Sequence, residues 1–156
     1  MSQAGGCVCG SIRYEIDHEP MFLQACHCKH CQTSTGSAFI TTWITESKNH
    51  RILQGEPKIF NTFTGGSGEG YDFNTCGECG TGLWATVKGS PGGLLFLRAG
   101  TLDETKKIKP LAHIYTKSKQ EWMILPDDVP SFEEGYEREK LWPHESLARL
   151  DTLFGS

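Results

Sequence analysis

Cys76-Gly77-Glu78-Cys79-Gly80 has the spacing of a zinc knuckle, a tight turn in which two sulfurs face one metal ion. Gly77 and Gly80 provide the backbone freedom, positive φ included, that such a turn requires. A closed structural zinc site has four protein ligands, so this pair of cysteines cannot complete one alone. The sequence therefore predicts that further cysteines join the knuckle.

Two other cysteine clusters lie nearer the N-terminus. Cys7-Val8-Cys9-Gly10 is predicted to be extended, with two thiols on one side, because alternate side chains of a strand share a face. Cys26-His27-Cys28-Lys29-His30-Cys31 carries three thiols that are local enough to grip one ion. Seven cysteines make four ligands plus three, and a catalytic zinc keeps three protein ligands and one open position. We therefore expect two zinc ions, one structural and one catalytic.

Spacing alone leaves the grouping of the cysteines open. The first pair could join the knuckle in a Cys₄ centre that ties the first strand to the middle of the chain. Alternatively, Cys26 and Cys28 could pair with the knuckle. In a third arrangement all seven cysteines bind structural zinc, and water or a histidine completes the second site.

Disulfide bonds explain the cysteines less well. A disulfide framework favours an even number of cysteines and a secreted protein. The start of the chain, Met1-Ser2-Gln3-Ala4-Gly5-Gly6, has neither the basic region nor the apolar run of a signal peptide. We therefore expect a cytoplasmic protein. No stretch of the sequence is long and apolar enough to cross a bilayer, so no membrane partner is expected.

The balance of charge argues against a nucleic-acid partner. The 156 residues include 15 Lys and Arg against 19 Asp and Glu, a net charge of −4, whereas nucleic-acid-binding domains carry basic surfaces. The length suits one domain with one core. Residues 1–156 are predicted to form a single zinc-binding domain, with a motif region at about 5–135 and a helical tail at 136–156.

Most of the patterned segments predict short β-strands. Ile12, Tyr14 and Ile16 alternate with polar residues, as in a half-buried strand. Further strands are predicted at 38–44, 59–64, 71–75, 83–87, 94–99 and 111–115, with glycine-rich loops at 65–68 and 89–93 closing two hairpins. Short helices are predicted after Cys28 as far as Gly36, at 131–134 from a capping box, and at 145–154. The predicted fold class is mainly β, a small irregular multi-sheet domain held by metal, with short helices.

Six motifs follow one another in order: Gly6-Cys7-Val8-Cys9-Gly10-Ser11-Ile12-Arg13-Tyr14-Glu15; Cys26-His27-Cys28-Lys29-His30-Cys31-Gln32 with Gly36 and Phe39; Phe73-Asn74-Thr75-Cys76-Gly77-Glu78-Cys79-Gly80-Thr81-Gly82-Leu83; Ala99-Gly100-Thr101-Leu102-Asp103; Pro110-Leu111-Ala112-His113-Ile114-Tyr115 with Trp122; and Asp127-Asp128-Val129-Pro130-Ser131-Phe132. In these motifs and their intervals the chain resembles the glutathione-dependent formaldehyde-activating enzyme family, which includes the centromere protein V domain.

The resemblance implies a zinc-binding β-tent fold similar to that of methionine sulfoxide reductase B. It also implies a grouping of the ligands: Cys7, Cys9, Cys76 and Cys79 on the structural zinc, and Cys26, Cys28 and Cys31 on the active-site zinc. The reaction that it implies is the addition of glutathione to formaldehyde, which gives S-(hydroxymethyl)glutathione and is classed with the carbon–sulfur lyases. The implied partners are therefore glutathione and a small aldehyde.

Cys28 is the predicted catalytic residue, because it is central in the three-thiol cluster and could leave the metal to react. Zinc coordination deprotonates a thiol, which makes it nucleophilic at neutral pH. Zinc could instead polarise the aldehyde oxygen as a Lewis acid. Three thiolates make the centre anionic and weaken its Lewis acidity, so activation of the thiol is favoured.

Three histidines invite functional roles but have simpler explanations. His27 and His30 alternate with the cysteines, and residues at such positions in a tight loop point away from the metal. We expect them to face solvent or to support a ligand by a hydrogen bond. His113 is predicted to be a core or hydrogen-bonded residue of a strand.

Three tryptophans and two arginines also have simple structural explanations. Trp43, Trp84 and Trp122 are predicted to pack in the core. Arg13 and Arg98 could bind a glutathione carboxylate, but arginines on strands usually mark a solvated face.

Other functions remain beside the leading one. A non-catalytic, zinc-stabilised interaction module is the first alternative, and an enzyme of the same family with a different small substrate is the second. A thiol redox enzyme ranks last, because it would need a reactive cysteine outside the zinc sites, and the sequence has no eighth cysteine.

Overall fold

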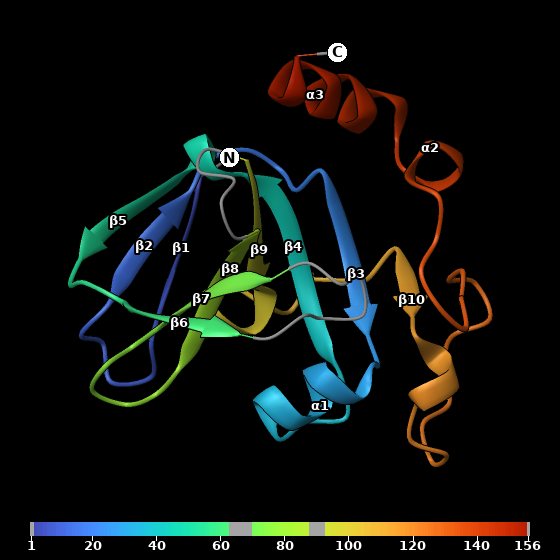
Figure 1. The fold of residues 1–156 in the computed structure, drawn as a ribbon, viewed down its shortest axis with the longest axis horizontal. Coiled ribbons are helices and arrows are strands. Elements are labelled where there is room, and N and C mark those ends of the chain that lie inside the picture. The colour runs from blue at the N-terminus through green and yellow to red at the C-terminus, as the bar shows by residue number, and fades with distance from the viewer. Residues whose placement is uncertain (1, 63–69, 88–92, 156) are drawn as a thin grey trace. The chain divides into compact units, whose positions relative to one another are not determined.

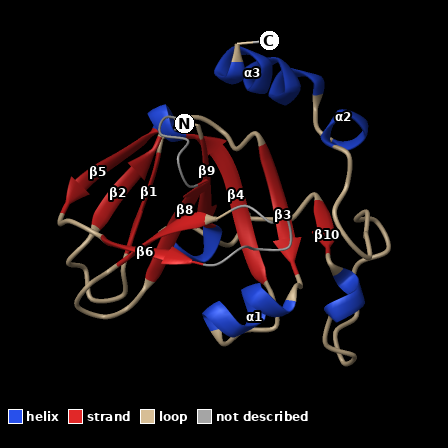
Figure 2. Cartoon of the chain, in the orientation of Figure 1, coloured by secondary structure: helices blue, strands red, loops and turns tan. Residues whose placement is uncertain are grey.

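A computed structural model describes residues 2–62, 70–87 and 93–155. The fold is mainly β, with two sheets and short helices, which confirms the predicted fold class (Figure 2). The chain divides into two compact units, 1–20 with 43–108 and 21–42 with 109–156, and strand β4 (Ile40–Glu46) runs from the second into the first (Figure 1). That residues 1–156 act as one domain stays a prediction.

The first unit contains a three-stranded antiparallel sheet. Its order is β1-β2-β5, with β1 at Gln3–Gly6, β2 at Arg13–Ile16 and β5 at His50–Gln54. The predicted alternation is present, since Tyr14 and Ile16 are fully buried while Arg13 and Glu15 are half-buried. Gly5 pairs with Tyr14, and a Cβ at Gly5 would overlap the Tyr14 hydroxyl, so only glycine allows this approach.

Four more strands of the first unit form two antiparallel hairpins. Strands β6 (Lys58–Thr62) and β7 (Tyr71–Thr75) pair with each other, as do β8 (Gly82–Val87) and β9 (Leu94–Arg98), in the order β9-β8-β7-β6. Both predicted hairpins are confirmed, while the predicted loop at 65–68, and that at 89–93 except Gly93, lie outside the described residues. One-turn 3₁₀ helices at Ser47–Asn49 and Ala99–Thr101 complete this unit. Trp43 and Trp84 are buried, as predicted.

The second unit pairs β3 (Phe22–Cys26) in parallel with β10 (Ala112–Ile114), so that Ile114 lies opposite Cys26. Helix α1 (Lys29–Thr35) follows β3 and ends at Gly36, as the sequence predicted, and Gly36 has the left-handed φ of 65° that is common at helix ends. A 3₁₀ turn at Thr116–Ser118 follows β10, and α2 (Arg138–Leu141) and α3 (His144–Phe154) end the chain.

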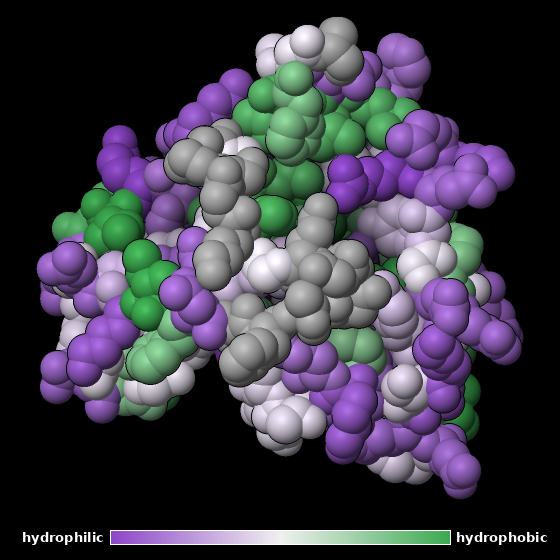
Figure 3. All heavy atoms as spheres, in the orientation of Figure 1, coloured by the Kyte–Doolittle hydropathy of each residue, from purple (hydrophilic) through white to green (hydrophobic). Residues whose placement is uncertain are grey.

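The C-terminal part of the second unit packs through aromatic rings. The Phe22 ring stacks on Trp142 at 5.4 Å between centroids. Helix α3 confirms the predicted helix at 145–154, and its leucines are half-buried while Phe154 is 55% exposed. Hydrophobic surface gathers over α3 in Figure 3. No helix among the described ranges combines the length and the apolar composition of a membrane span.

The predictions for residues 131–134 and for Trp122 are wrong. The capping box at 131–134 starts no helix, because Ser131 forms a bridge with His113 and the Phe132 amide donates to the His113 carbonyl at 2.9 Å. Pairing with strand β10 thus overrides the local signal. Trp122 is 70% exposed and does not pack in the core.

Candidate metal centres

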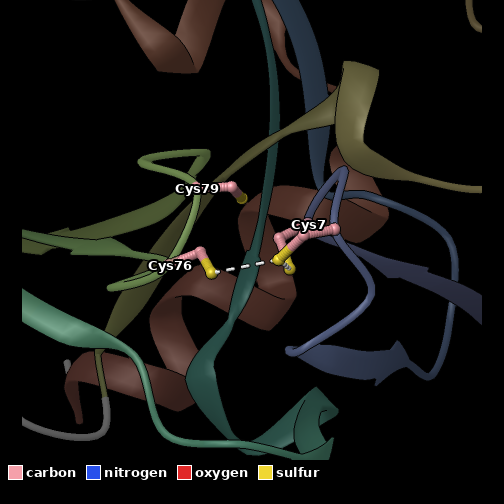
Figure 4. A group of neighbouring side chains, drawn as sticks. Cys7, Cys76 and Cys79 are labelled. Atoms are coloured by element: carbon pink, nitrogen blue, oxygen red, sulfur yellow. Dashed lines mark hydrogen bonds between the residues drawn. The ribbon is translucent and has the colours of Figure 1, made fainter.

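Four cysteines of the first unit form one cluster. Cys7 and Cys9 follow β1, and Cys76 and Cys79 lie between β7 and β8, with all four sulfurs within 4.8 Å of one another. Sγ of Cys9 lies 3.4 Å from Sγ of Cys7 and 3.7 Å from Sγ of Cys76. Figure 4 shows Cys7, Cys76 and Cys79 reaching towards one another from two separate loops. We call this group the four-thiol cluster.

Both loops are turns closed by a glycine. The Gly10 amide donates to the Cys7 carbonyl and the Gly80 amide to the Cys76 carbonyl, each at 3.0 Å. The two glycines have φ of 79° and 73°, values that other residues rarely adopt. The predicted knuckle is therefore present at Cys76–Gly80. The prediction of an extended segment at Cys7–Cys9 is wrong, because the chain turns there.

The geometry of the four-thiol cluster fits zinc. Sulfurs at about 2.3 Å from a tetrahedral zinc lie about 3.8 Å apart, close to the separations observed. The Ile12 amide donates to Sγ of Cys7 at 3.2 Å, and the Thr81 hydroxyl lies 3.1 Å from Sγ of Cys79. The Thr81 hydroxyl, followed by backbone bonds, lowers the pKa of Cys79 to about 6. Burial raises the pKa of Cys7, but the Ile12 amide and neighbouring thiols outweigh it and lower that pKa overall.

Three cysteines of the second unit form the other cluster, which we call the three-thiol cluster. Cys26 ends β3, Cys28 caps the N-terminus of α1, and Cys31 lies in its first turn, with the three sulfurs within 4.8 Å of one another. Cys26 is buried and the other two are half-buried. The Cys31 amide donates to Sγ of Cys28 at 3.4 Å. The helix and the strand end thus turn three thiols towards one point.

The three thiols of this cluster shift one another's pKa values. Hydrogen bonds from the Cys26 and Cys31 thiols lower the pKa of Cys28 to about 2. The bond to Cys28 in turn raises the pKa of Cys26 to about 12, and the pKa of Cys31 is raised by Cys26 and Cys28. Among the residues that the structure describes, no fourth Cys, His, Asp or Glu joins this group. Its three donors fit a zinc ion that keeps one position for another ligand.

The seven cysteines therefore form two clusters, of four and of three, and each could hold a metal ion. This grouping is the one that the family resemblance implied, and the alternative pairing of Cys26 and Cys28 with the knuckle is not found. That the ions are two zincs, and that these cysteines are their ligands, stays a prediction.

His27 is fully buried, so the expectation that it could face solvent is wrong. Its Nε2 lies 2.9 Å from Nδ1 of His113, which confirms His113 as a hydrogen-bonded strand residue. Burial, followed by the charge of His113, lowers the pKa of His27 to about 4. Burial also lowers the pKa of His113. The two rings are therefore neutral near pH 7 and form a hydrogen-bonded pair that joins the cysteine loop to β10.

Gln32 is the residue near this cluster that sequence reasoning missed. It is 8% exposed, and its side-chain amide donates to the carbonyls of His27 at 2.9 Å and Ser118 at 2.8 Å. The sequence offered one signal, a polar residue directly after Cys31 on the buried side of a short helix.

The two arginines considered as carboxylate ligands are engaged within the first unit. Nη1 and Nη2 of Arg13 both donate to the carboxylate of Asp103. The Arg98 guanidinium lies over the Phe73 ring, 5.6 Å from its centroid. Neither contact assigns these side chains to a substrate.

The fold and its clusters define a small, mainly β protein with two sets of cysteines suited to metal. Residues 2–118, about three quarters of the chain, match the model of a family described as glutathione-dependent formaldehyde-activating enzyme, and the chain belongs to this family. A crystal structure of a Rhodobacter sphaeroides protein is 16% identical, covering 69% of this chain and 91% of its own, with a TM-score of 0.49. No curated protein matches the chain.

Proposed function

We propose that this protein is a zinc-dependent enzyme that adds glutathione, or a related thiol, to formaldehyde or a similar small carbonyl compound. The observation that carries the proposal is the three-thiol cluster, whose three donors leave one tetrahedral position for a ligand from outside. Family membership supports the choice of thiol and aldehyde.

The proposed ligands divide by cluster. Cys7, Cys9, Cys76 and Cys79 would hold a structural zinc, and Cys26, Cys28 and Cys31 an active-site zinc. A zinc bound at the second cluster would supply a positive charge that keeps a thiol deprotonated at neutral pH. Cys28 is the proposed catalytic residue, because it is central in the cluster, the Cys26 and Cys31 thiols lower its pKa, and its side chain is half-buried rather than enclosed.

The reaction forms one carbon–sulfur bond. The thiolate sulfur attacks the carbonyl carbon, the carbonyl π electrons move to oxygen, and that oxygen takes up the proton lost by the thiol. The product is a hemithioacetal, which for glutathione and formaldehyde is S-(hydroxymethyl)glutathione, so no oxidant or reductant is required. The chain contributes to this reaction by holding the three thiols in place. Strand β3 positions Cys26, and helix α1 positions Cys28 and Cys31 close to it.

Cys28→Ser tests the proposal, with Cys79→Ser as the matched variant in the other cluster. We expect the wild-type protein to hold two zinc ions and Cys28→Ser to hold one, with an unchanged circular dichroism spectrum. The uncatalysed addition is fast, so the assay is NMR exchange between free glutathione and its formaldehyde adduct at equilibrium. The wild type should accelerate this exchange, and Cys28→Ser should not.

Two outcomes would contradict the proposal. If Cys28→Ser loses one zinc but accelerates exchange as the wild type does, the catalytic assignment is wrong. If the wild type holds two ions but accelerates exchange for no small thiol and aldehyde, the alternatives of a zinc-stabilised interaction module or of a different substrate replace it.

A further inference from the structure

The three thiols of the three-thiol cluster are held by two different elements. Cys26 belongs to β3, where it lies opposite Ile114 of β10. Cys28 and Cys31 belong to α1, as its N-cap and a residue of its first turn. The separation between the Cys26 sulfur and the other two therefore depends on the backbone that joins strand to helix, at His27 and Cys28.

His27 is fixed on both sides of its backbone. Its amide donates to the Ile114 carbonyl at 2.9 Å, which continues the pairing with β10. Its carbonyl accepts from Nε2 of Gln32 at 2.9 Å. Gln32 is itself in α1, so this bond links the helix to the strand end that it follows.

The second hydrogen of the Gln32 amide reaches Ser118, in the 3₁₀ turn after β10, at 2.8 Å. Because both neighbours are carbonyl oxygens, only Nε2 can occupy this place, and the orientation of the amide is determined. On its other side, Oε1 accepts from Nε2 of Gln120 at 3.4 Å, and Gln120 accepts from the Trp122 indole at 2.6 Å. One buried side chain thus joins the cysteine loop, helix α1 and the segment after β10.

We propose that Gln32 is a positioning residue of the three-thiol cluster, whose amide bonds to the His27 and Ser118 carbonyls set the placement of Cys28 and Cys31 relative to Cys26. The proposal rests on the metal centre in the proposed function, though on neither its substrate nor its reaction. Without these bonds α1 can shift about the His27–Cys28 backbone, and the three sulfurs no longer meet at tetrahedral positions. Loss of a residue that supports metal ligands costs about 10- to 100-fold in affinity.

Gln32→Met tests this, since methionine has similar length and no N–H donor. Gln54→Met is the matched control, because Gln54 makes a comparable amide-to-carbonyl bond to Gly10 in the other unit, at 3.3 Å. Each protein is loaded with zinc and then titrated with a chromophoric chelator. In Gln32→Met we expect one ion to bind about 10- to 100-fold more weakly and the other to bind as in the wild type. In Gln54→Met that same ion should bind with the wild-type affinity.

Replacing zinc by cobalt gives a second measurement, the visible absorption spectrum of the bound ion. A general loss of stability would not change this spectrum. Cobalt at the three-thiol cluster has a visible absorption band set by its ligand geometry, so Gln32→Met should shift that band and leave that of the four-thiol cluster unchanged. If Gln32→Met does not fold, Gln32→Glu, which keeps the size of the side chain but loses both donors, takes its place.

The outcomes separate this proposal from the proposed function. Two ions bound with wild-type affinity and an unshifted cobalt spectrum in Gln32→Met would overturn the positioning role alone. Suppose that the wild type binds two ions but shows no turnover, and that Gln32→Met still loses one ion selectively. This result would overturn the proposed function and leave the positioning role of Gln32 intact. A wild type that binds only one ion would overturn both.

Discussion

His50 provides a test of the packing of the first unit through pH. Its ring lies 4.2 Å from the Trp84 ring and 5.3 Å from that of Tyr14, measured between centroids. Its buried Nε2 has no hydrogen-bond partner among the described residues. Burial therefore lowers the pKa of His50 from 6.5 to about 4.

The sign and size of the effect follow from this pKa. As the pH falls below 6.5, His50 takes up a proton in the unfolded chain before it can do so in the folded one, so the folded state loses stability until the pH reaches about 4. Above about pH 7.5 both states are neutral and His50 makes no contribution. The full shift corresponds to about 2 kcal/mol at pH 5, and because the residue is half-buried we expect about 1–2 kcal/mol.

The assay is urea unfolding of the zinc-loaded protein at about pH 7.5 and pH 5, for the wild type and for His50→Phe. The expected result is a loss of unfolding free energy between the two pH values that is about 1–2 kcal/mol smaller in His50→Phe. Acid also weakens thiolate–metal bonds, but both proteins share that loss. His18→Gln, which removes an exposed imidazole, controls for the number of histidines. Equal pH dependence in wild type and His50→Phe would refute the reasoning.

Three further predictions concern metal and packing. Cys76→Ser should remove one zinc ion and several kcal/mol of stability, because metal binding is coupled to folding; elemental analysis with thermal denaturation checks this, and two retained ions would contradict it. Tyr14→Phe should cost about 1 kcal/mol in urea unfolding, because the buried hydroxyl donates to Thr101 at 2.6 Å, and no loss would show that this bond is absent. Trp142 is 6% exposed, so Trp142→Ala should lower the free energy of unfolding by about 3–5 kcal/mol. Trp122 is 70% exposed, so Trp122→Ala should lower it by less than about 0.5 kcal/mol. Urea unfolding measures both, and the reverse order would contradict the observed burial.

Strand β2 was predictable from its alternation, whereas strand β3 was not predicted. Tyr14 and Ile16 alternate with polar residues, and β2 lies where this period places it. In β3, Phe22, Leu23 and Ala25 are all buried, so the segment has no alternation to detect. It lies in the sheet between β4 and β10, and β10 is far along the chain.

The helix predictions show the same division. Helix α1 is local: Cys28 caps it and Gly36 ends it, and both signals lie within a few residues of the helix. The capping box that begins at Ser131 was as good a local signal, yet that segment bonds to His113 in β10. A backbone amide that finds a strand partner has no need of a helix, so tertiary pairing decides the outcome.

The number of thiols, and the closeness of Cys26, Cys28 and Cys31 to one another, were set by the amino-acid order alone, because three cysteines within six consecutive residues cannot lie far apart. Only the tertiary structure decided that Cys9 meets Cys76, 67 positions away, and that Gln32 meets Ser118, 86 positions away. Such contacts depend on how strands pair and where each chain turn falls, and no short stretch of sequence carries that information.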